Sequence, residues 1–307
     1  MTHVNVLTQP ESIGTSSSGD VRLLKDDNGL DYLEIDNKYA TAKLALQGAH
    51  VMHWQPKSAN EPVLWLSSNA RYIPGRSIRG GVPVCWPWFG AHPTDSSYCP
   101  HGFARVVPWE LKESSRLKNG TTRVLLEMTQ TDLAKKQLSY PYVFTLEITV
   151  GNSLRMEMTT TNLANHPFMI GEAFHTYFNV SDVANTKITG LENVVYSDKV
   201  AGYVRNVQHG ALQFDGEFDR VYLSSGEDCV IHDSGFGRAI HVAKSGSNTT
   251  VIWTPGAEKA AQMGDMGTRD EWRKMLCVES ANAMENSVTI FPNETHKMVT
   301  EYSLETL

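Results

Sequence analysis

The feature that most limits how this chain can fold is a hydrophobic pattern that repeats every second residue. Apolar side chains alternate with polar or small ones along several short runs, which is typical of β-strands with one buried face. The clearest runs are residues 40–46, 144–150, 154–158, 288–290 and 298–304. Residues 151–153, Gly-Asn-Ser, lie between two of these runs and have the composition of a turn. We therefore predict a β-hairpin over residues 144–158.

Helical patterns are scarce in the sequence. Residues 131–138 predict one short helix, and residues 270–274 predict a turn or two. Since strands do not alternate with long helices, a parallel βαβ sheet is disfavoured. The predicted fold is all-β, a large antiparallel β-sandwich with few short helices. No low-complexity linker divides the 307 residues, so we expect an N-terminal arm over residues 1–20 and a single β-sandwich domain over residues 21–307.

The charge balance narrows the classes of partner. A formal net charge of −7 argues against nucleic acid and membrane surfaces, because both bind basic faces. An anionic small molecule stays open, since a local pair of arginines can bind it within an acidic protein. The four cysteines show no C-x-x-C spacing and are too few for a disulfide framework. The first 14 residues lack a signal-peptide pattern and no run of about 18 apolar residues occurs, so we expect a cytoplasmic protein.

Residues 77–90 are dense in glycine, proline and aromatic residues. Such a composition does not form a regular ladder of strand hydrogen bonds, and it predicts a rigid loop with an aromatic wall. Aromatic faces suit the C–H faces of sugars, and Arg79 beside them suits a carboxylate or a phosphate. The alternative is that these rings are core residues beneath a long loop, which the usual preference of large apolar groups for the interior favours.

Two short segments add weaker candidates. His101 precedes a glycine and lies four residues before Arg105, and Asp219 is placed to accept hydrogen bonds from sugar hydroxyls. Taken alone, each has an ordinary alternative. These alternatives are a loop histidine bonded to the backbone, a surface arginine and a turn carboxylate.

The segment 172–179, Glu-Ala-Phe-His-Thr-Tyr-Phe-Asn, predicts a strand with one polar and aromatic face. In such a strand His175 shares its face with Ala173, Tyr177 and Asn179, and that face can line a pocket. The alternative, which the residues alone favour, is an interior histidine with satisfied hydrogen bonds.

Glu279 follows an apolar, strand-like run over residues 275–278. A carboxylate in this place is either exposed at the end of a strand or held inside a site. In a buried site its pKa would be raised by desolvation, which helps a general base to act near neutral pH.

Metal-binding patterns are weak. His50 and His53 have H-x-x-H spacing but face opposite sides of a strand-like segment, and Cys99 and His101 have no matching second pair. Patterns typical of dinucleotide, nucleotide and serine-hydrolase sites do not occur in the sequence. We predict neither a metal nor a cofactor.

Six motifs follow one another between roughly residues 40 and 290. They are Gly48-Ala49-His50-Val51 with Trp54, Leu64-Trp65-Leu66-Ser67, Ile78-Arg79-Gly80-Gly81-Val82-Pro83, His101-Gly102-Phe103-Ala104-Arg105, Phe174-His175-Thr176-Tyr177-Phe178 and Cys277-Val278-Glu279. In this order and spacing they resemble the aldose 1-epimerase superfamily, and most closely its glucose-6-phosphate 1-epimerase (hexose-6-phosphate mutarotase) family. The resemblance implies a galactose-mutarotase-like β-sandwich, in agreement with the period-two pattern.

The resemblance also implies an isomerase that interconverts the α and β anomers of a hexose 6-phosphate, with glucose 6-phosphate as the expected substrate. It implies His175 as the general acid and Glu279 as the general base, lying across the sugar ring from each other. Opening a hemiacetal requires a proton on the ring oxygen and the loss of one from the C1 hydroxyl. One acid and one base within hydrogen-bond reach therefore suffice, without a redox cofactor or metal.

The remaining candidates are substrate-binding residues by the same resemblance. Arg79 and Arg105 match positions that bind the substrate, with phosphate as the expected anion, and His101 and Asp219 match further substrate contacts. One position departs from the family pattern. Pro100 precedes the His-Gly pair where some members have a polar side chain, so that side-chain contact is missing.

Three rival functions remain open on the sequence. A carbohydrate-binding module needs no internal acid–base pair, so the convergence of His175 and Glu279 in one cleft distinguishes an enzyme from it. A glycoside hydrolase requires two carboxylates about 5–9 Å apart, for which only Glu279 and Asp219 are available. A free-sugar aldose 1-epimerase differs in whether the arginines meet phosphate. We expect a monomer whose partner is a small-molecule sugar phosphate.

Overall fold

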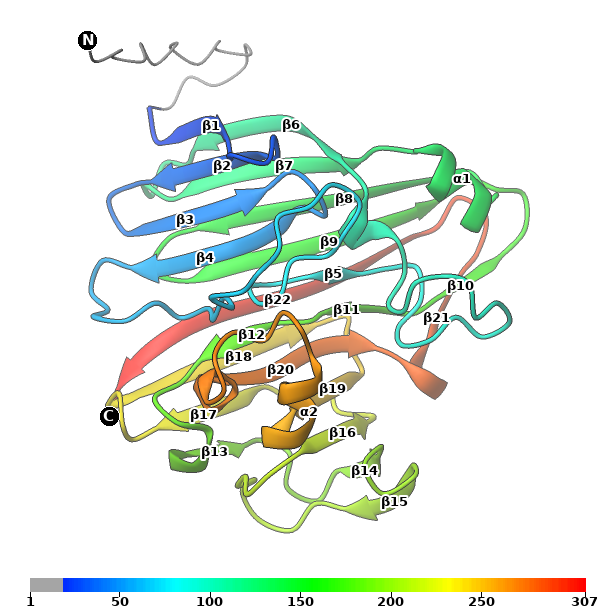
Figure 1. Ribbon diagram of the computed structural model, residues 1–307. Helices are drawn as coiled ribbons and strands as arrows, with labels where there is room; N and C mark the ends of the chain where they lie inside the picture. Colours follow the sequence, from blue (N-terminus) through cyan, green and yellow to red (C-terminus); the bar gives the residue numbers. More distant parts are fainter. Residues whose placement is uncertain (1–18) are drawn as a thin grey trace, which may run out of the picture.

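Strands dominate the computed structural model, which describes residues 19–307 (Figure 1). The first of two eight-stranded sheets contains, in spatial order, β15 (Val204–Val207), β14 (Val195–Asp198), β16 (Phe218–Leu223), β19 (Thr249–Thr254), β20 (Met275–Asn282), β11 (Glu172–Phe174) and β5 (Val84–Cys85), with β12 (Tyr177–Asn179) also paired to β20. The second contains β13 (Thr186–Thr189), β17 (Cys229–Asp233), β18 (Arg238–Ser245), β22 (Thr295–Thr306), β9 (Leu154–Asn162), β8 (Tyr142–Val150), β7 (Thr122–Met128) and β6 (Trp109–Arg116).

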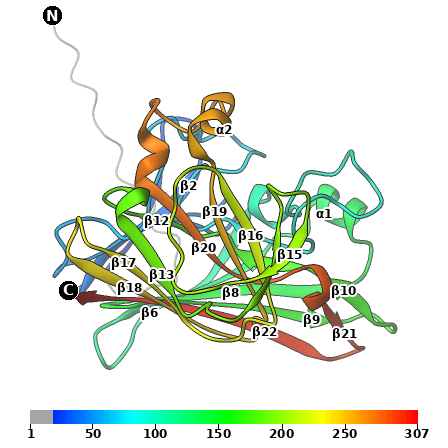
Figure 2. The same cartoon turned by 90° about the horizontal axis from the view of Figure 1, so that it is seen from below.

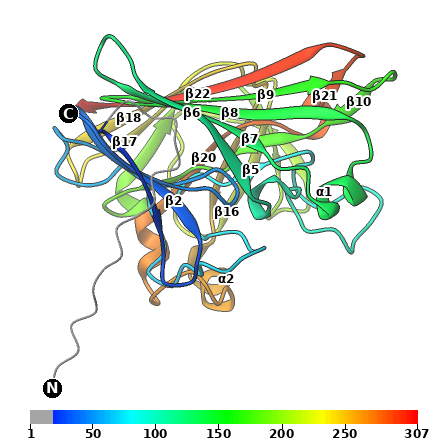
Figure 3. The ribbon, with the colours of Figure 1, turned by 90° about the horizontal axis from the view of Figure 1, so that it is seen from above.

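Two smaller sheets complete the strand structure. One contains β1 (Val21–Lys25), β2 (Asp31–Asp36), β3 (Ala40–Ala45) and β4 (His50–Pro56), and the other pairs β10 (Phe168–Ile170) with β21 (Val288–Ile290). The pairings between these strands are antiparallel, so the predicted antiparallel β-sandwich is confirmed. The second sheet forms a nearly flat layer, with the first sheet packed against one of its sides (Figures 2 and 3).

The predicted hairpin forms the centre of the second sheet. β8 and β9 pair from Tyr142↔Asn162 to Val150↔Leu154, which places the turn at residues 151–153 as expected. Alternate residues of both strands are buried, and they belong to the main hydrophobic core: Phe144, Leu146, Ile148, Val150, Leu154, Met156 and Met158. The period-two pattern therefore identified one buried face of this sheet correctly.

Helices are few and short, in line with the sequence. The predicted helix is α1 (Asp132–Gln137), which begins after Thr131, whose hydroxyl accepts a hydrogen bond from the Ala134 amide at 3.2 Å. The turn expected at residues 270–274 is the 3₁₀ helix η3 (Glu271–Lys274). Helix α2 (Gly256–Gln262) has no counterpart among the predicted elements. The other 3₁₀ helices are η1 (Ala104–Val106), η2 (Val183–Asn185) and η4 (Met284–Asn286).

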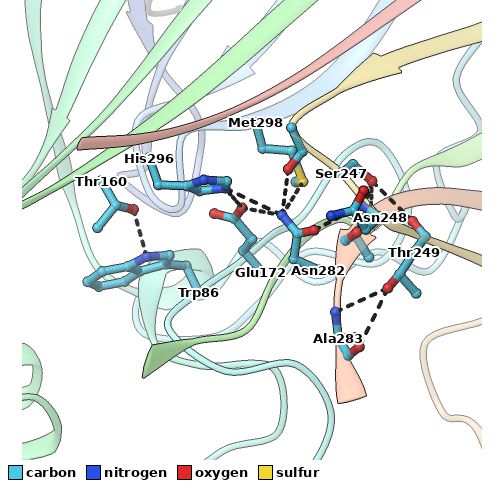
Figure 4. A network of polar contacts seen from close by, with 12 residues as sticks. Trp86, Thr160, Glu172, Ser247, Asn248, Thr249, Asn282, Ala283, His296 and Met298 are labelled. Atoms are coloured by element: carbon cyan, nitrogen blue, oxygen red, sulfur yellow. Dashed lines mark hydrogen bonds and ion pairs between the residues drawn. The ribbon is translucent and has the colours of Figure 1, made fainter. Parts of the chain in front are cut away.

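The aromatic residues of segment 77–90 correct one expectation. Trp86 is fully buried in the main core, where its ring stacks on Phe144 at 4.4 Å and its indole N–H donates to the Thr160 hydroxyl at 3.0 Å (Figure 4). Trp88 is also buried. The predicted aromatic wall is therefore wrong for both tryptophans. The reason is β5, which joins this segment to the sheet through β11 and turns the following rings into the interior.

The boundary of the N-terminal arm stays a prediction. The predicted arm, residues 1–20, lies almost wholly outside the described residues. Asp20 is nevertheless buried and accepts a hydrogen bond from Arg116 Nε at 2.6 Å, so the packed body includes it. Of the helices in residues 19–307, none has the length and apolar character needed to cross a membrane. The single-domain division stays a prediction.

Candidate active site

The candidate site lies on the outer face of the first sheet, which points away from the second sheet. Ala281 on β20 packs with Val251 and Val221 in an apolar cluster separate from the main core. Cys277 and Glu279 alternate with core residues along the same strand and share the side of Ala281. Helix α2 lies over this side of the sheet (Figure 2).

His175 occupies a break between two strands rather than the middle of one. The predicted strand 172–179 is divided into β11 and β12, because the Thr176 amide donates to the Phe174 carbonyl at 2.9 Å and closes a tight local turn. The His175 amide donates to the Pro83 carbonyl at 3.0 Å. Its ring stacks on that of Tyr177 with 5.0 Å between centroids, so both side chains lie on one side, as expected.

His175 and Glu279, predicted as an acid–base pair, come together. Nδ1 of His175 lies 3.4 Å from Oε1 of Glu279 and 3.7 Å from Sγ of Cys277. This distance leaves no room for a sugar ring between the two groups, so the expectation that they flank the ring is wrong. The ring oxygen and the C1 hydroxyl are bonded to the same carbon, and neighbouring side chains can therefore reach both from one side.

Burial shifts the two groups in opposite directions. Desolvation raises the pKa of Glu279 well above its usual range, and Asp219 adds to this shift while Lys199 opposes it. Desolvation lowers the pKa of His175 well below its usual value, with further contributions from His101 and Arg105. Burial therefore favours the uncharged form of each group, a protonated Glu279 beside a neutral His175.

His101 lies beside this pair in a strained backbone conformation. Its φ of 66° falls in the left-handed region, which a non-glycine residue rarely adopts. Nδ1 accepts a hydrogen bond from the Gly90 amide at 3.4 Å, and the ring centroid lies 5.4 Å from that of His175. Burial, with a contribution from Arg105, lowers the pKa of His101 to about 3. With Nδ1 as the acceptor, the neutral ring carries its proton on Nε2 and can donate it to a ligand.

Arg79 is held beside the pair by two anchors. Its Nη1 donates to the Tyr177 hydroxyl at 2.8 Å, and its Nε donates to Oδ1 of Asp265 at 3.1 Å. The oxygens of Tyr177 and Asp265 raise the pKa of the guanidinium further, so the charge is permanent. The side chain keeps 25% of its surface exposed, which leaves guanidinium N–H groups available for an anion.

Arg105 contributes to a second concave region next to the pair. Its Nη2 donates to the carbonyl of Pro100 at 2.6 Å, and its buried Nε has no partner among the described residues. Pro100, which departs from the family pattern, has no side-chain hydrogen-bonding group, but its carbonyl oxygen accepts this bond and orients Arg105. A cavity of about 400 Å³ is lined by Arg105 together with Arg71, Arg76 and Asp265. Three guanidinium groups around one small cavity favour a small anion.

Asp219 lies on the same face but farther away. It pairs across the sheet with Trp253, which in turn pairs with Cys277, so two strand spacings of roughly 5 Å each separate Asp219 from that cysteine. Its Oδ2 forms an ion pair with Lys199 at 2.9 Å, while its buried Oδ1 has no partner in residues 19–307. Burial raises the pKa of Asp219, and Lys199 opposes the shift.

Sequence reasoning missed several neighbours of the site. Lys199, Asp265, Arg71 and Arg76 lie in loops without any pattern that indicates their position. Cys277 did stand in one of the quoted motifs, two residues before Glu279, and period-two alternation alone places both side chains on one face.

Comparisons with known proteins identify the family and the fold. Residues 31–303 match the family model described as aldose 1-epimerase. A protein of Escherichia coli K12, provisionally named glucose-6-phosphate 1-epimerase, is 38% identical over 258 residues, which span 83% of this chain and 84% of that protein. A crystal structure from Salmonella typhimurium, provisionally described as a mutarotase, has a TM-score of 0.87 at 31% identity over 95% of both chains. A galactose mutarotase-like protein from Clostridium acetobutylicum shares the fold with a TM-score of 0.69 at 14% identity, over 94% of this chain and 98% of that one.

Proposed function

The chain belongs to the aldose 1-epimerase family, and from this premise we propose that it interconverts the α and β anomers of a hexose 6-phosphate, with glucose 6-phosphate as the first candidate. The observation that supports this most strongly is the 3.4 Å contact between His175 Nδ1 and Glu279 Oε1 on the outer face of the first sheet. A carbohydrate-binding module has no use for a buried acid–base pair, so the contact favours catalysis.

The proposed reaction moves two protons and leaves their number unchanged. His175 in its charged form donates a proton from Nε2 to the ring oxygen as the bond from that oxygen to C1 breaks. Glu279 in its ionised form takes the proton of the C1 hydroxyl as the aldehyde forms. The aldehyde then turns by rotation about C1–C2, and the reverse transfers close the ring on its other face.

The opposite pKa shifts of the two groups suit this exchange. After ring opening the pair consists of a protonated Glu279 and a neutral His175, which is the form that burial favours. Before ring opening the proton lies on Nε2 of His175, and the reverse transfers return it there from the substrate when the ring closes. Since α-to-β and β-to-α conversion need the same two steps in opposite order, a pair with one shared proton serves both directions.

We assign the binding of the substrate's phosphate group to the arginines. Arg79 beside Tyr177 and Arg105 beside Pro100 carry permanent charges on one side of the acid–base pair, and the cavity at Arg105 adds Arg71 and Arg76. A planar guanidinium group can form two parallel, charge-assisted hydrogen bonds with two oxygens of one phosphate. This arrangement favours a phosphorylated sugar over a free one.

The other contacts complete the proposed substrate site. His101, through Nε2–H, and Asp219, through its unpartnered Oδ1, are assigned to sugar hydroxyls. The net charge of −7 favours a small-molecule partner over nucleic acid or a membrane surface. The cytoplasmic location and the monomeric state remain predictions from the sequence.

Exchange measurements on freshly dissolved α-glucose 6-phosphate test the proposal. NMR exchange or polarimetry should reveal protein-dependent conversion to the β anomer, with glucose and galactose measured alongside at the same concentrations. We expect a higher kcat/KM on the phosphorylated sugar than on either free sugar. Acceleration of none of the three would refute the enzyme assignment, and equal rates on all three would refute the phosphate site alone.

A further inference from the structure

The three atoms that meet at the centre of the site form a ligand set for a metal ion. We propose that His175 Nδ1, Cys277 Sγ and Glu279 Oε1 bind a thiophilic divalent cation such as Zn²⁺ or Co²⁺, and that the bound cation stops the epimerase reaction. The binding stands on geometry alone, whereas the inhibition rests on the proposed function. The cation acts here as an inhibitor that competes for catalytic atoms and is no part of the reaction.

The spacing of these atoms matches a tetrahedral zinc site. With Zn–N of about 2.05 Å, Zn–O of about 2.1 Å and Zn–S of about 2.3 Å, a tetrahedron has N···O edges of about 3.4 Å and edges to sulfur of about 3.6 Å. The observed edges are 3.4 Å between His175 and Glu279 and 3.7 Å between His175 and Cys277. All ligand atoms lie within 4.8 Å of one another, so the third edge needs to close by at most about 1.2 Å.

The backbone holds these ligands in place before a metal arrives. Cys277 and Glu279 are alternate residues of β20, which is flanked on both sides by paired strands. His175 lies on the adjacent segment, fixed through its amide to Pro83. The second carboxyl oxygen of Glu279 is buried and has no partner in the described part of the chain, so this carboxyl group is not saturated by the protein. Three protein ligands with an open fourth position are typical of zinc sites that admit water or another oxygen.

The charges around the site select the kind of cation. Arg79 and Arg105 lie close enough to lower the pKa of His175, and they repel any cation that does not form strong bonds. A soft ion gains such bonds from a thiolate and an imidazole, whereas Mg²⁺ prefers six oxygen ligands. Binding releases the thiol proton of Cys277, and that of Glu279 where it is protonated, to the solvent. The affinity should therefore rise with pH.

A cation in this position removes the proposed chemistry. It occupies the Oε1 lone pair that accepts the C1 hydroxyl proton, and it occupies Nδ1, so that His175 cannot form the charged ring that donates from Nε2. Addition of a chelator restores both groups, so the inhibition should be reversible. Mg²⁺ at the same concentration should leave the exchange rate unchanged.

Cobalt provides a direct test that needs no substrate. Titration of the full-length wild-type protein with Co²⁺ should produce a thiolate-to-cobalt absorption band in the near ultraviolet, and Zn²⁺ should abolish it by displacement. Cys277→Ser should lose the band and weaken Zn²⁺ binding by at least about a hundredfold, because a direct ligand contributes no less than an outer-shell partner. Cys99→Ser is the matched control, since Cys99 lies two residues from His101 but outside the proposed set, and it should keep both.

A band that persists in Cys277→Ser, or the lack of a band in the wild type, would overturn the proposal. Should Cys277→Ser fail to fold, Glu279→Gln replaces it: this variant keeps the thiol but should weaken Co²⁺ binding by at least tenfold. Zn²⁺ inhibition is then measured in the wild type, in Cys99→Ser and, where it folds, in Cys277→Ser, as the ratio of anomer exchange rates with and without the ion; Glu279→Gln, which lacks the proposed base, is used for Co²⁺ binding only. A cobalt band in a protein without epimerase activity would contradict only the proposed function, and an active enzyme without the band would contradict only the metal site.

Discussion

Two buried glutamate–histidine pairs lie on opposite faces of the first sheet. Glu279 on β20 meets His175 on the outer face, while Glu172 on β11 meets His296 of β22 on the face turned to the second sheet (Figure 4). Both carboxyl groups are almost fully buried, and each has one oxygen without a partner in residues 19–307. Burial and an unpaired oxygen therefore do not distinguish a structural pair from a catalytic one.

The hydrogen-bond partners do distinguish them. Oε1 of Glu172 accepts from His296 Nε2 at 2.7 Å and from Asn282 Nδ2 at 2.8 Å. Asn282 is itself fixed, because it donates to the Gly246 carbonyl at 2.7 Å and accepts from the Asn248 amide at 2.9 Å (Figure 4). This network ties β11, β20 and β22 together and fixes Oε1 of Glu172 between two donors.

Glu279 has a looser setting. Its nearest donor is His175 at 3.4 Å, and no backbone or amide group fixes its second oxygen within the described residues. Arg79 and Arg105 stand nearby, which is where an anionic substrate would be drawn. The two faces therefore differ in the donors on the bonded oxygen, which are two at 2.7 and 2.8 Å for Glu172 but one contact at 3.4 Å for Glu279, and in the arginines near Glu279.

The sharpest test of this difference is Glu279→Gln. The amide keeps the shape of the side chain but cannot take a proton, so we expect anomer exchange on glucose 6-phosphate to fall by about 10²–10⁴-fold. The fold should persist, with a midpoint of thermal unfolding no lower than that of the wild type. NMR exchange gives the rate and circular dichroism the midpoint. Near-normal turnover in this variant would mean that the His175–Glu279 pair has a structural role, like the Glu172–His296 pair.

The second test concerns the arginine side chains that lie near the His175–Glu279 pair. Arg105→Gln should remove a charge-assisted contact with phosphate, worth about 1.5–3 kcal/mol, or roughly a 10- to 150-fold loss in kcat/KM on glucose 6-phosphate. Activity on free glucose should change far less, so the ratio of the two substrates is the internal control. Equal losses on both would make Arg105 a residue that supports the loop rather than the substrate.

The sequence predicted the fold well wherever one face of a strand is buried. The hairpin of β8 and β9 follows directly from alternation, because each apolar residue had a clear place in the core. Helix α2 escaped prediction, since it begins directly after Pro255 with Gly256 at a φ of 66°, a start that looks like a turn. For Trp86 the sequence left a wall and a core position open, because local composition does not tell which way a ring points, and the structure shows the core position.

The candidate site was predictable in its members but not in its geometry. The order of the motifs linked Glu279 to His175 about a hundred residues away, whereas Cys277, which alternation puts on the face of Glu279, was not predicted. The side-by-side arrangement of the pair depends on the local turn at Thr176, which splits the expected strand, and no pattern in the sequence indicates that turn. Lys199 and Asp265 came to the site through loops, whose paths depend on tertiary packing.

The inner pair should respond in the opposite way to the outer one. Glu172→Gln keeps an acceptor for one of the two donors but loses the charge that holds His296, so we expect a loss of about 1–2 kcal/mol in the free energy of unfolding. The rate of anomer exchange should stay within a few-fold of the wild type at temperatures where both are folded. Urea unfolding measures the stability and NMR exchange the rate. A large loss of rate with intact stability would mean that the network controls the catalytic face.

The last test distinguishes the two pairs by the pH dependence of stability. Burial raises the pKa of Glu279 from its ordinary value of 4.5, so above pH 4.5 the folded state retains a proton that the unfolded chain loses. The contribution of this group to stability is therefore complete below pH 4.5 and declines as the pH rises toward its folded pKa. Glutamine has no such proton, and the free energy of unfolding of Glu279→Gln minus that of the wild type should grow with pH by at most about 1.4 kcal/mol per unit. Urea unfolding between pH 4.5 and 7 measures this slope. A difference that stays constant over this interval would mean that Glu279 ionises at its ordinary pKa, and the outer pair would then lack the shared proton on which its proposed role depends.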